Sequence, residues 1–306
     1  MARRPTRRLA LVASLVLILG CSGGAGSVTS VKETPEASTT VATASTTSPT
    51  IETTTTTTST IDTTTTTAPS IAAIDPLPGA EVGIPEGEGR FPGVVLVHGG
   101  AWLVGSPAAI KSLAIYLTDN GYLTVNASYH LSQQSPGFPA AIDDIACAVR
   151  YAASHPRSDG TVVVIGHSAG AHIGSLVALT GDRYGDDCPY PGTGVPERFV
   201  GLAGPYDIAR LGPIMLTFFG STPEESPEDW QAGNPQLQVG ENPALRTLLI
   251  HGDLDQVVPA DFSENFFNAL DGTDADVAIL VLEGVDHVEV RDPGIIGEMV
   301  LDWLSE

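Results

Sequence analysis

The sequence predicts an α/β domain in which helices cover both faces of a mostly parallel, doubly wound sheet. Short apolar runs of strand length alternate along the chain with longer segments of helical pattern, and this rhythm is typical of parallel sheets. One such run, Thr161–Ile165, leads directly into the pentapeptide Gly166–Gly170 (GHSAG), which opens a helical segment. A buried strand, a tight turn and a helix in that order leave one serine hydroxyl exposed at the turn. We therefore expect the chemistry of this chain at one edge of the sheet.

The N-terminal residues are expected to form a leader that is not part of the fold. Four arginines precede an eleven-residue apolar stretch, Leu9–Leu19. That stretch is too short to span a bilayer but suits a signal peptide. Cys21 follows a glycine there, which resembles the cleavage box of bacterial lipoproteins. Residues 1–21 are thus predicted to be a lipoprotein-type signal peptide with lipidation at Cys21. The alternative is an ordinary secretory signal with an incidental cysteine, and the export route, Sec or Tat, stays open.

Residues 22–73 are predicted to form a disordered linker. Threonine dominates this segment, including the unbroken run Thr53–Thr58, and such a composition cannot bury enough apolar surface to fold. The segment would act as a stalk, although low-complexity drift without a role is the alternative. Residues 74–306 remain for one domain with a core of good size. The protein is accordingly expected to be exported, extracytoplasmic and lipid-anchored to the cell membrane.

Charge excludes one class of partner. The chain carries 14 basic residues, four of them in the leader, against 36 acidic residues, and its formal net charge is −22. Such a surface repels nucleic acid and anionic lipid. We expect no nucleic-acid partner and membrane contact only through the anchor, with a small molecule as substrate. The sequence leaves the oligomeric state open.

Six apolar runs are predicted as strands that are covered on both faces. They are 93–97, 122–126, 161–165, 199–202, 248–251 and 277–282, and the helices between and after them are expected at 107–118, 139–154, 169–180, 260–270 and 294–304. Residues 183–197 and 206–245 break this rhythm with Pro, Gly and Asp, which is typical of small cap insertions at the mouth of a pocket. The apolar segment Leu211–Phe219 would line an acyl site or pack into the core.

A serine nucleophile needs a base that takes its proton and a third group that orients the base. Two carboxylates, Asp253 and Asp255, follow the predicted strand that ends at His251, and His287 follows the next strand. The carboxyl ends of parallel strands share one edge, so these groups are expected near Ser168. The order Ser, Asp, His along the chain is the one used by α/β-hydrolases.

Four motifs together resemble the carboxylesterase branch of the α/β-hydrolase fold, the esterase/lipase group that includes hormone-sensitive-lipase-like enzymes, feruloyl esterases and kynurenine formamidases. They are HGGAW at 98–102, GHSAG at 166–170, HGDLDQVVP at 251–259 and the pair Asp286-His287, and the similarity extends from about 91 to 304. Such relatives usually have a β-hairpin before the first parallel strand. Here only residues 71–91 are available for it, which predicts a shortened sheet edge.

This resemblance implies a role for each motif residue. Ser168 would be the nucleophile, His287 the general base and then acid, and Asp255 its orienting partner, because the family pattern selects Asp255 over Asp253. Backbone N–H groups of Gly100, Ala101 and Ala169 would form the oxyanion hole. Trp102 would wall the substrate pocket or lie buried behind the loop.

The remaining histidines and acids are interpreted structurally. We expect His172 to be packed and hydrogen-bonded, His98 to shape the oxyanion loop, His167 to pack beside the turn and His251 to end a strand. The pair Asp143 and Asp144 is expected to cap or pair at a helix start. Histidines and acids are not spaced as zinc or calcium ligands, so no metal and no cofactor is proposed.

Two cysteines, Cys147 and Cys188, remain besides Cys21. Cys147 lies in the predicted helix before the serine strand, and Cys188 follows the helix after it. In an exported domain disulfides persist, so a bridge between the two is possible; two buried thiols are the alternative.

The leading interpretation is a serine hydrolase that cleaves carboxylic esters through an acyl-enzyme. Short acyl chains are expected because no long apolar lid is evident. One alternative is an amide or peptide hydrolase, such as a formamidase or exopeptidase, since that chemistry uses the same serine. A less favoured alternative is a catalytically silent surface-binding protein of the same fold, but its hallmark, a lost triad residue, is not seen.

Overall fold

Seven strands form one sheet, in the order β1-β3-β2-β4-β5-β6-β7. The computed structural model describes residues 75–133, 135–273 and 275–306. Its strands are β1 (Glu81–Gly83), β2 (Phe91–Val97), β3 (Leu123–Ala127), β4 (Ser158–His167), β5 (Arg198–Leu202), β6 (Arg246–Gly252) and β7 (Asp276–Leu282). From β3 to β7 all neighbouring strands pair in parallel, and only β1 runs antiparallel, to β3. The fold is the predicted mostly parallel sheet.

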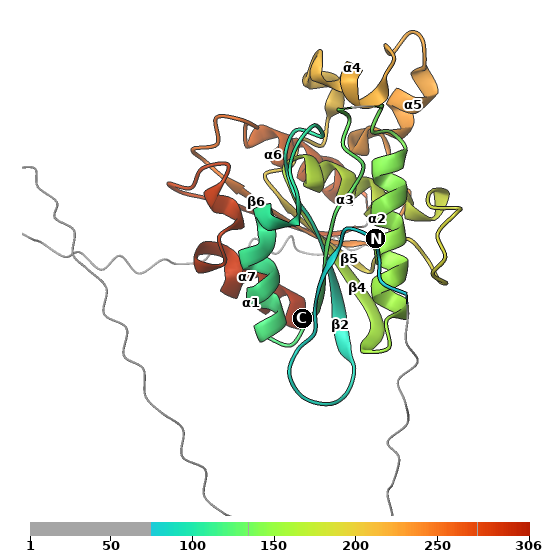
Figure 1. Ribbon diagram of the computed structural model, residues 1–306. Coiled ribbons are helices and arrows are strands. Elements are labelled where there is room, and N and C mark those ends of the chain that lie inside the picture. Colours follow the sequence, from blue (N-terminus) through green and yellow to red (C-terminus); the bar gives the residue numbers. More distant parts are fainter. Residues whose placement is uncertain (1–74, 134, 274) are drawn as a thin grey trace, which may run out of the picture. The chain divides into compact units, whose positions relative to one another are not determined.

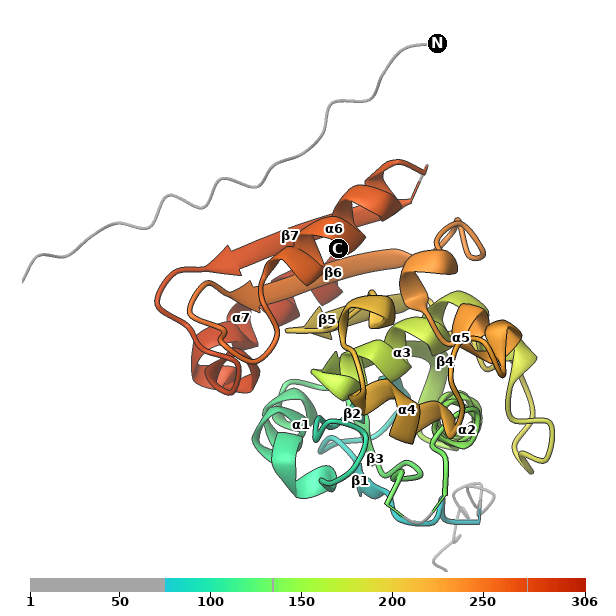
Figure 2. The same ribbon diagram turned by 90° about the horizontal axis from the view of Figure 1, so that it is seen from above.

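Helices cover both faces of the sheet, as the sequence predicts (Figures 1 and 2). The principal ones are α1 (Lys111–Asp119), α2 (Ala140–Ser154), α3 (Ala169–Thr180), α6 (Asp261–Asp271) and α7 (Pro293–Ser305). The side chains of β2 alternate between two cores: Val95 packs with α2, α3 and α6, whereas Leu96 packs with α1 and α7. Burial on both faces explains why the parallel strands appear in the sequence as continuous apolar runs.

The differences from the predicted elements lie at their ends. The segment predicted as one helix over 107–118 begins as a 3-10 turn, Pro107–Ile110, before α1. The strand predicted at 161–165 extends from Ser158 to His167. Of the described residues before β2, 75–90, only the three residues of the edge strand β1 form a strand, which agrees with the expected shortened edge. Cys21 and the predicted leader and linker lie outside the described residues.

Residues 206–245, the longer of the two segments that break the strand-helix rhythm, form a small cap above the carboxyl ends of the strands (Figure 1). It contains two six-residue helices, α4 (Ile214–Phe219) and α5 (Pro227–Ala232), and two 3-10 turns. In α4, Met215, Phe218 and Phe219 are buried in the core, which favours the packing interpretation of this segment. Among the described helices none is long and apolar enough to cross a membrane.

Candidate active site

The nucleophile turn joins β4 to α3 and holds Ser168 in a strained conformation. Ser168 has φ 54° and ψ −121°, a backbone region that costs a residue with a Cβ about 1–3 kcal/mol. Close packing enforces it: a Cβ on Gly166 would lie 2.3 Å from the carbonyl oxygen of Gly170, and one on Gly170 would lie 2.2 Å from that of Val97. The two glycines of the pentapeptide are therefore required by the contact of the turn with α3 and β2.

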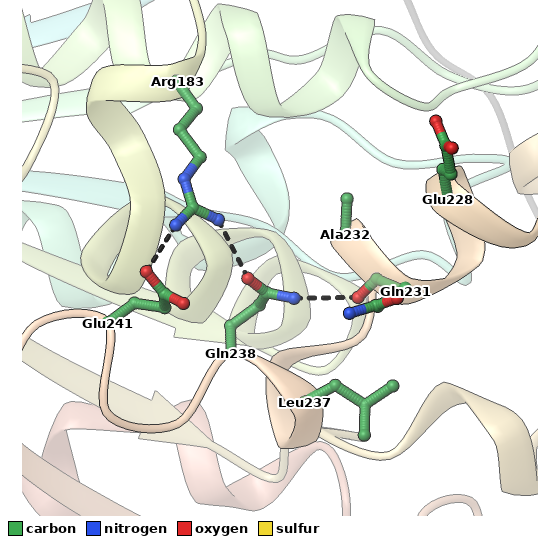
Figure 3. Close-up of a pocket in the computed structure, with 7 residues that line it drawn as sticks. All are labelled: Arg183, Glu228, Gln231, Ala232, Leu237, Gln238 and Glu241. Atoms are coloured by element: carbon green, nitrogen blue, oxygen red, sulfur yellow. Dashed lines mark hydrogen bonds and ion pairs between the residues drawn. The ribbon is translucent and has the colours of Figure 1, made fainter.

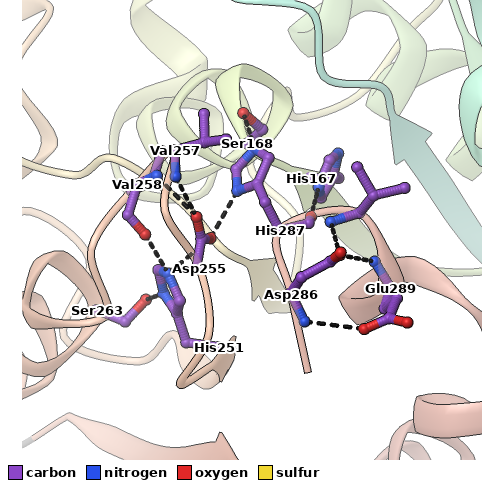
Figure 4. Close-up of polar contacts among 11 residues, drawn as sticks. His167, Ser168, His251, Asp255, Val257, Val258, Ser263, Asp286, His287 and Glu289 are labelled. Carbon is purple, nitrogen blue, oxygen red and sulfur yellow. Dashed lines mark hydrogen bonds and ion pairs between the residues drawn. The ribbon is translucent and has the colours of Figure 1, made fainter. Parts of the chain in front are cut away.

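Three side chains from separate loops meet at this turn (Figure 4). The hydroxyl of Ser168 lies 3.0 Å from Nε2 of His287, and Nδ1 of His287 lies 2.6 Å from Oδ2 of Asp255. Proton transfer from serine to the ring requires Nε2 as the acceptor and Nδ1–H as the donor to the carboxylate. The structure thus brings the predicted nucleophile, base and orienting acid into one hydrogen-bonded line.

The two carboxylates of the loop after β6 lie in different places. Asp253 points toward the following loop, where its Oδ1 accepts from the backbone N–H of Gly284 at 2.7 Å. Asp255 is buried, and its Oδ1 accepts from the N–H groups of Val257 and Val258, each at 2.8 Å. Only Asp255 contacts His287.

Asp255 is held in its ionised form. Burial by itself raises the pKa of this carboxyl, but the hydrogen bonds from His251, His287 and the two backbone N–H groups outweigh it and hold the pKa well below its usual range. A carboxylate that stays charged can orient the His287 ring and stabilise it when it becomes an imidazolium.

A second histidine, His251, contacts the same carboxylate, which the sequence interpretation missed. His251 is the last residue but one of β6, and its side chain is fully buried. Its Nε2 lies 3.2 Å from Oδ2 of Asp255 and 2.8 Å from the carbonyl oxygen of Val258, and Nδ1 lies 2.7 Å from the hydroxyl of Ser263. The four-residue spacing within HGDLD was the available signal, because a tight turn after a strand returns the chain to that distance.

The predicted oxyanion loop lies beside the serine. Ala101 and Trp102 have φ of 52° and 61°, and a Cβ on Gly99 would lie 3.0 Å from Cβ of Ser168. Among the described residues, none accepts a hydrogen bond from the backbone N–H of Gly100, Ala101 or Ala169. Unpaired donors near the nucleophile suit an anion that develops there during reaction.

The model of one protein family matches more than half of this chain. The BD-FAE family model matches residues 82–270, which span strands β1 to β6 and include Ser168 and Asp255. The chain belongs to the BD-FAE family.

Named relatives of this BD-FAE protein are esterases. It is 28% identical over 214 residues to Esterase LipC of Mycobacterium tuberculosis, covering 64% of this chain and 52% of that protein. It is 25% identical over 229 residues to isoprenylcysteine alpha-carbonyl methylesterase ICME of Arabidopsis thaliana, covering 67% and 53%. The chain therefore spans about half the length of the curated relatives it matches.

Solved structures establish the fold of this BD-FAE protein. A truncated carbohydrate esterase from gut microbiota superimposes with a TM-score of 0.65 at 21% identity, covering 74% of this chain and 90% of that one. Thermogutta terrifontis esterase 2, phosphoramylated by tabun, gives 0.62 at 18% identity, with 76% and 96% covered. Together with the sheet order, these similarities show the α/β-hydrolase fold.

Trp102 and His172 pack behind the oxyanion loop of this BD-FAE protein. Trp102 is only 4% exposed, and its indole N–H donates to Nδ1 of His172 at 3.1 Å. The structure thus favours burial of Trp102 over the predicted pocket wall. Nε2 of His172 lies 2.9 Å from the carbonyl oxygen of Gly233, so His172 is packed and hydrogen-bonded as expected.

The rings of His98 and His167 each contact a backbone carbonyl oxygen. His98 stacks on Tyr129 with ring centroids 4.4 Å apart, and its Nδ1 lies 2.8 Å from the carbonyl oxygen of Gly99. Nε2 of His167 lies 2.7 Å from the carbonyl oxygen of His287. Burial lowers the pKa of His167 to about 4, so this ring is neutral at pH 7 and donates one N–H to that carbonyl.

A disulfide joins Cys147 of α2 to Cys188, with Cα atoms 5.4 Å apart, which favours the bridge over two buried thiols. Close by, the side chain of Asp143 accepts from the N–H of Gly185, and that of Asp144 accepts from the N–H of His130. Both acids start α2 and tie loops to it. No group of histidine, cysteine and acidic side chains in the described residues could hold a metal ion.

A hollow is lined mainly by residues of the cap (Figure 3). Within it, Arg183 donates to Gln238 and pairs with Glu241. The other lining residues are Glu228, Gln231, Ala232 and Leu237. None of these residues belongs to the Ser168 site, so this hollow does not add to the chemistry of the serine.

Proposed function

We propose that this BD-FAE protein is a serine hydrolase that cleaves carboxylic esters through a covalent acyl-enzyme. The observation that carries the proposal is the line from the Ser168 hydroxyl through His287 to an ionised Asp255, beside unpaired backbone donors. Relatives named esterase, methylesterase and carboxylic ester hydrolase support an ester over an amide.

The reaction divides into two similar steps. The oxygen of Ser168 attacks the ester carbonyl while Nε2 of His287 takes its proton, and the carbonyl oxygen becomes an oxyanion beside Gly100, Ala101 and Ala169. His287 then gives the proton to the departing alcohol, which leaves an acyl group on Ser168. Water repeats the sequence, releases the acid and restores the serine.

We also infer that the preferred acyl chains are short. The cap has only two six-residue helices, and the apolar side chains of Met215, Phe218 and Phe219 pack into the core. A long acyl chain would need a larger apolar surface to leave water. Faster turnover of a dodecanoyl ester than of a butyryl ester would contradict this inference.

We propose further that the protein acts outside the cytoplasm, anchored through a lipid on Cys21 and carried on the threonine-rich linker. The apolar stretch Leu9–Leu19 and the cysteine that follows it support this proposal. Mass spectrometry of the mature N-terminus tests it: a diacylglycerol adduct on Cys21 is expected, and a mature chain that starts elsewhere without lipid would overturn it.

A fluorophosphonate probe tests the hydrolase proposal, because it reacts only with an activated serine. A relative of the same fold is phosphoramylated by tabun, which is also an organophosphorus compound. We expect labelling of the wild type and of Ser154→Ala, whose hydroxyl only donates to the carbonyl of Tyr151 within α2. Ser168→Ala should not be labelled. An unlabelled but folded wild type would refute the proposal.

A substrate panel then separates ester from amide hydrolysis. We expect p-nitrophenyl acetate and butyrate to be cleaved faster than N-formylkynurenine or an aminoacyl anilide. Faster cleavage of an amide would replace the esterase proposal with the amidase alternative, because both use the same three side chains.

A further inference from the structure

Three groups form a hydrogen-bonded chain behind the oxyanion loop, and none of them contacts the reacting atoms. The indole of Trp102 donates to His172, and His172 donates to the carbonyl of Gly233 in the cap. These two hydrogen bonds join residues that are 70 and 61 positions apart in the sequence. The buried imidazole of His172, a residue of the nucleophile helix α3, therefore links the oxyanion loop to the cap.

The chemistry of its two neighbours fixes the form of His172. An indole nitrogen can only donate, so Nδ1 must accept; a carbonyl can only accept, so Nε2 must carry the hydrogen. Burial lowers the pKa of His172 to about 4, an effect that the hydrogen bond to Gly233 only partly offsets. The ring is therefore neutral and in one tautomer at pH 7. With both nitrogens engaged, it is also unable to act as the base for Ser168.

The loop that this imidazole holds is strained. Ala101 and Trp102 both have positive φ, a conformation that costs a residue with a side chain of the order of 1 kcal/mol or more and persists only when its surroundings enforce it. The carbonyl of Trp102 accepts from the N–H of Ser132 at 2.8 Å, and its indole is fixed by His172. Trp102 is thus held at both its backbone and its ring, directly after the residue predicted to donate to the oxyanion.

We propose that His172 is a positioning residue that fixes the oxyanion loop through Trp102 and ties that loop to the cap through Gly233. This inference rests on the proposed function, because it assigns the residues that place its oxyanion donors. If the backbone donors are displaced, they stabilise the oxyanion less. Binding of the ester in its ground state stays nearly as before. The expected signature is a lower kcat with KM almost unchanged.

Two substitutions of His172 separate its two hydrogen bonds. The amide oxygen of asparagine can lie where Nδ1 accepts from Trp102, whereas the amide nitrogen of glutamine can lie where Nε2 donates to Gly233. We expect His172→Asn, which keeps the bond from Trp102 and loses the bond to Gly233, to lower kcat for p-nitrophenyl acetate only about threefold. His172→Gln and Trp102→Phe should each lower kcat about tenfold or more. Equal kcat values for the asparagine and glutamine variants, or an unchanged kcat for Trp102→Phe, would overturn the proposal.

A matched control is available in the cap. The indole of Trp230 also donates to a backbone carbonyl, that of Ser221, at 3.1 Å, but its ring stacks on Phe219 and not on the oxyanion loop. Trp230→Phe therefore loses the same kind of bond and should keep kcat within about twofold. A tenfold loss in this variant would show that any lost indole bond disturbs catalysis and would refute a specific role for Trp102.

Gly233→Ala provides a second route if the His172 variants do not fold. A Cβ at Gly233 would lie 2.6 Å from two ring atoms of Phe219, so either that ring or the backbone that carries the carbonyl accepting from His172 must shift. We expect kcat to fall severalfold in a protein that still shows a cooperative thermal transition; an unchanged kcat would refute the tie to the cap.

The pH profile tests whether His172 takes up or releases a proton during the reaction. The acid limb of kcat/KM should stay in place in His172→Asn, because the ring is already neutral; a shifted limb would mean that His172 titrates during the reaction and would refute the positioning role. Failure of the wild type to cleave any ester would instead refute the proposed function. Normal cleavage with unaffected Trp102→Phe and His172→Gln variants would remove the positioning role alone.

Discussion

The two halves of the active site are held by different kinds of force. On the base side, a buried charge organises the structure: Asp255 accepts from His251, His287 and two backbone N–H groups. On the oxyanion side the groups are neutral, and a strained backbone is held by close packing and by the bond from Trp102 to His172. The first half depends on side-chain chemistry, whereas the second depends on shape.

This contrast predicts different sensitivities. Changing the charge on the base side while keeping the shape should be severe, because the hydrogen bonds all end on one carboxylate. On the oxyanion side, the donors are backbone groups, so substitutions should matter through the space that a new atom occupies or through the loss of a contact that holds the loop. The following variants test the contrast.

The largest effect is expected for Asp255→Asn, which keeps the shape and removes the charge. Its amide nitrogen can face Nδ1 of His287 and favour the wrong tautomer, so kcat should fall about 10⁴-fold. Steady-state kinetics with p-nitrophenyl butyrate measures this loss. Asp253→Asn is the control, because Asp253 only accepts from the N–H of Gly284, and it should remain near wild type. Equal losses in both variants would contradict the assignment of Asp255.

Gly100→Ala tests the oxyanion side by shape alone. Gly100 has φ 135°, and its new Cβ would lie 1.8 Å from the carbonyl oxygen of Val104, so the loop must open. We expect kcat to fall about 10²- to 10³-fold, the usual cost of losing an oxyanion donor. Gly87→Ala is matched, since Gly87 has φ 94° with no atom within 4 Å of the new Cβ. It should lose some stability and no activity; comparable loss of activity there would implicate backbone strain in general.

His251→Leu removes one hydrogen-bond donor to Asp255 from the charged side. A hydrogen bond to a charged group contributes about 1.5–3 kcal/mol, so kcat should fall about ten- to a hundredfold if that contribution persists in the transition state. His251→Gln can return an N–H to the position of Nε2 and should recover part of the rate. If the leucine and glutamine variants behave alike, the loss comes from packing and not from the bond to Asp255.

A smaller effect concerns pH and stability. The pKa values of His172 and His167 are lowered to about 4 by burial, from about 6.5 in an unfolded chain. A lowered histidine pKa gives stability that is complete above pH 6.5 and is lost as pH falls toward 4, because the unfolded chain takes up the proton first. Each histidine accounts for up to about 3 kcal/mol across that window.

Urea denaturation at pH 7.5 and pH 5 measures this dependence. The free energy of unfolding should fall between these values, and the drop should be smaller in His172→Asn than in the wild type. An unchanged drop in this variant would mean that His172 is not a neutral buried group. Asp255 loses its own contribution only at lower pH, below about 4, because its pKa in the fold is depressed.

The strand centres were predictable from the sequence because burial on both faces leaves continuous apolar runs. Their ends were not, because polar side chains begin several strands. Arg246 and Asp276 open β6 and β7 and pair across the sheet at 2.8 Å, a contact that local composition does not reveal. The cap was predicted only as an irregular insertion, because its short helices are set by packing.

The site divides in the same way. Ser168, Asp255 and His287 could be named because each follows a predicted strand at the same edge, in a motif of fixed spacing. The bond from Trp102 to His172 could not be predicted, since it joins segments 70 residues apart and either side chain alone suggests only a buried residue. Sequence patterns indicate which groups react more readily than which groups hold them in place.

His167, the residue before the nucleophile, matters for any attempt to engineer the active site. His167 occupies the variable second position of the pentapeptide, yet its ring donates to the carbonyl of His287 and so spans from the nucleophile turn to the loop of the base. A designer who varies this position to widen the entrance would also alter the spacing between two reacting residues. Libraries at position 167 should therefore be paired with variation in the loop around residue 287, so that a new side chain finds a matching partner.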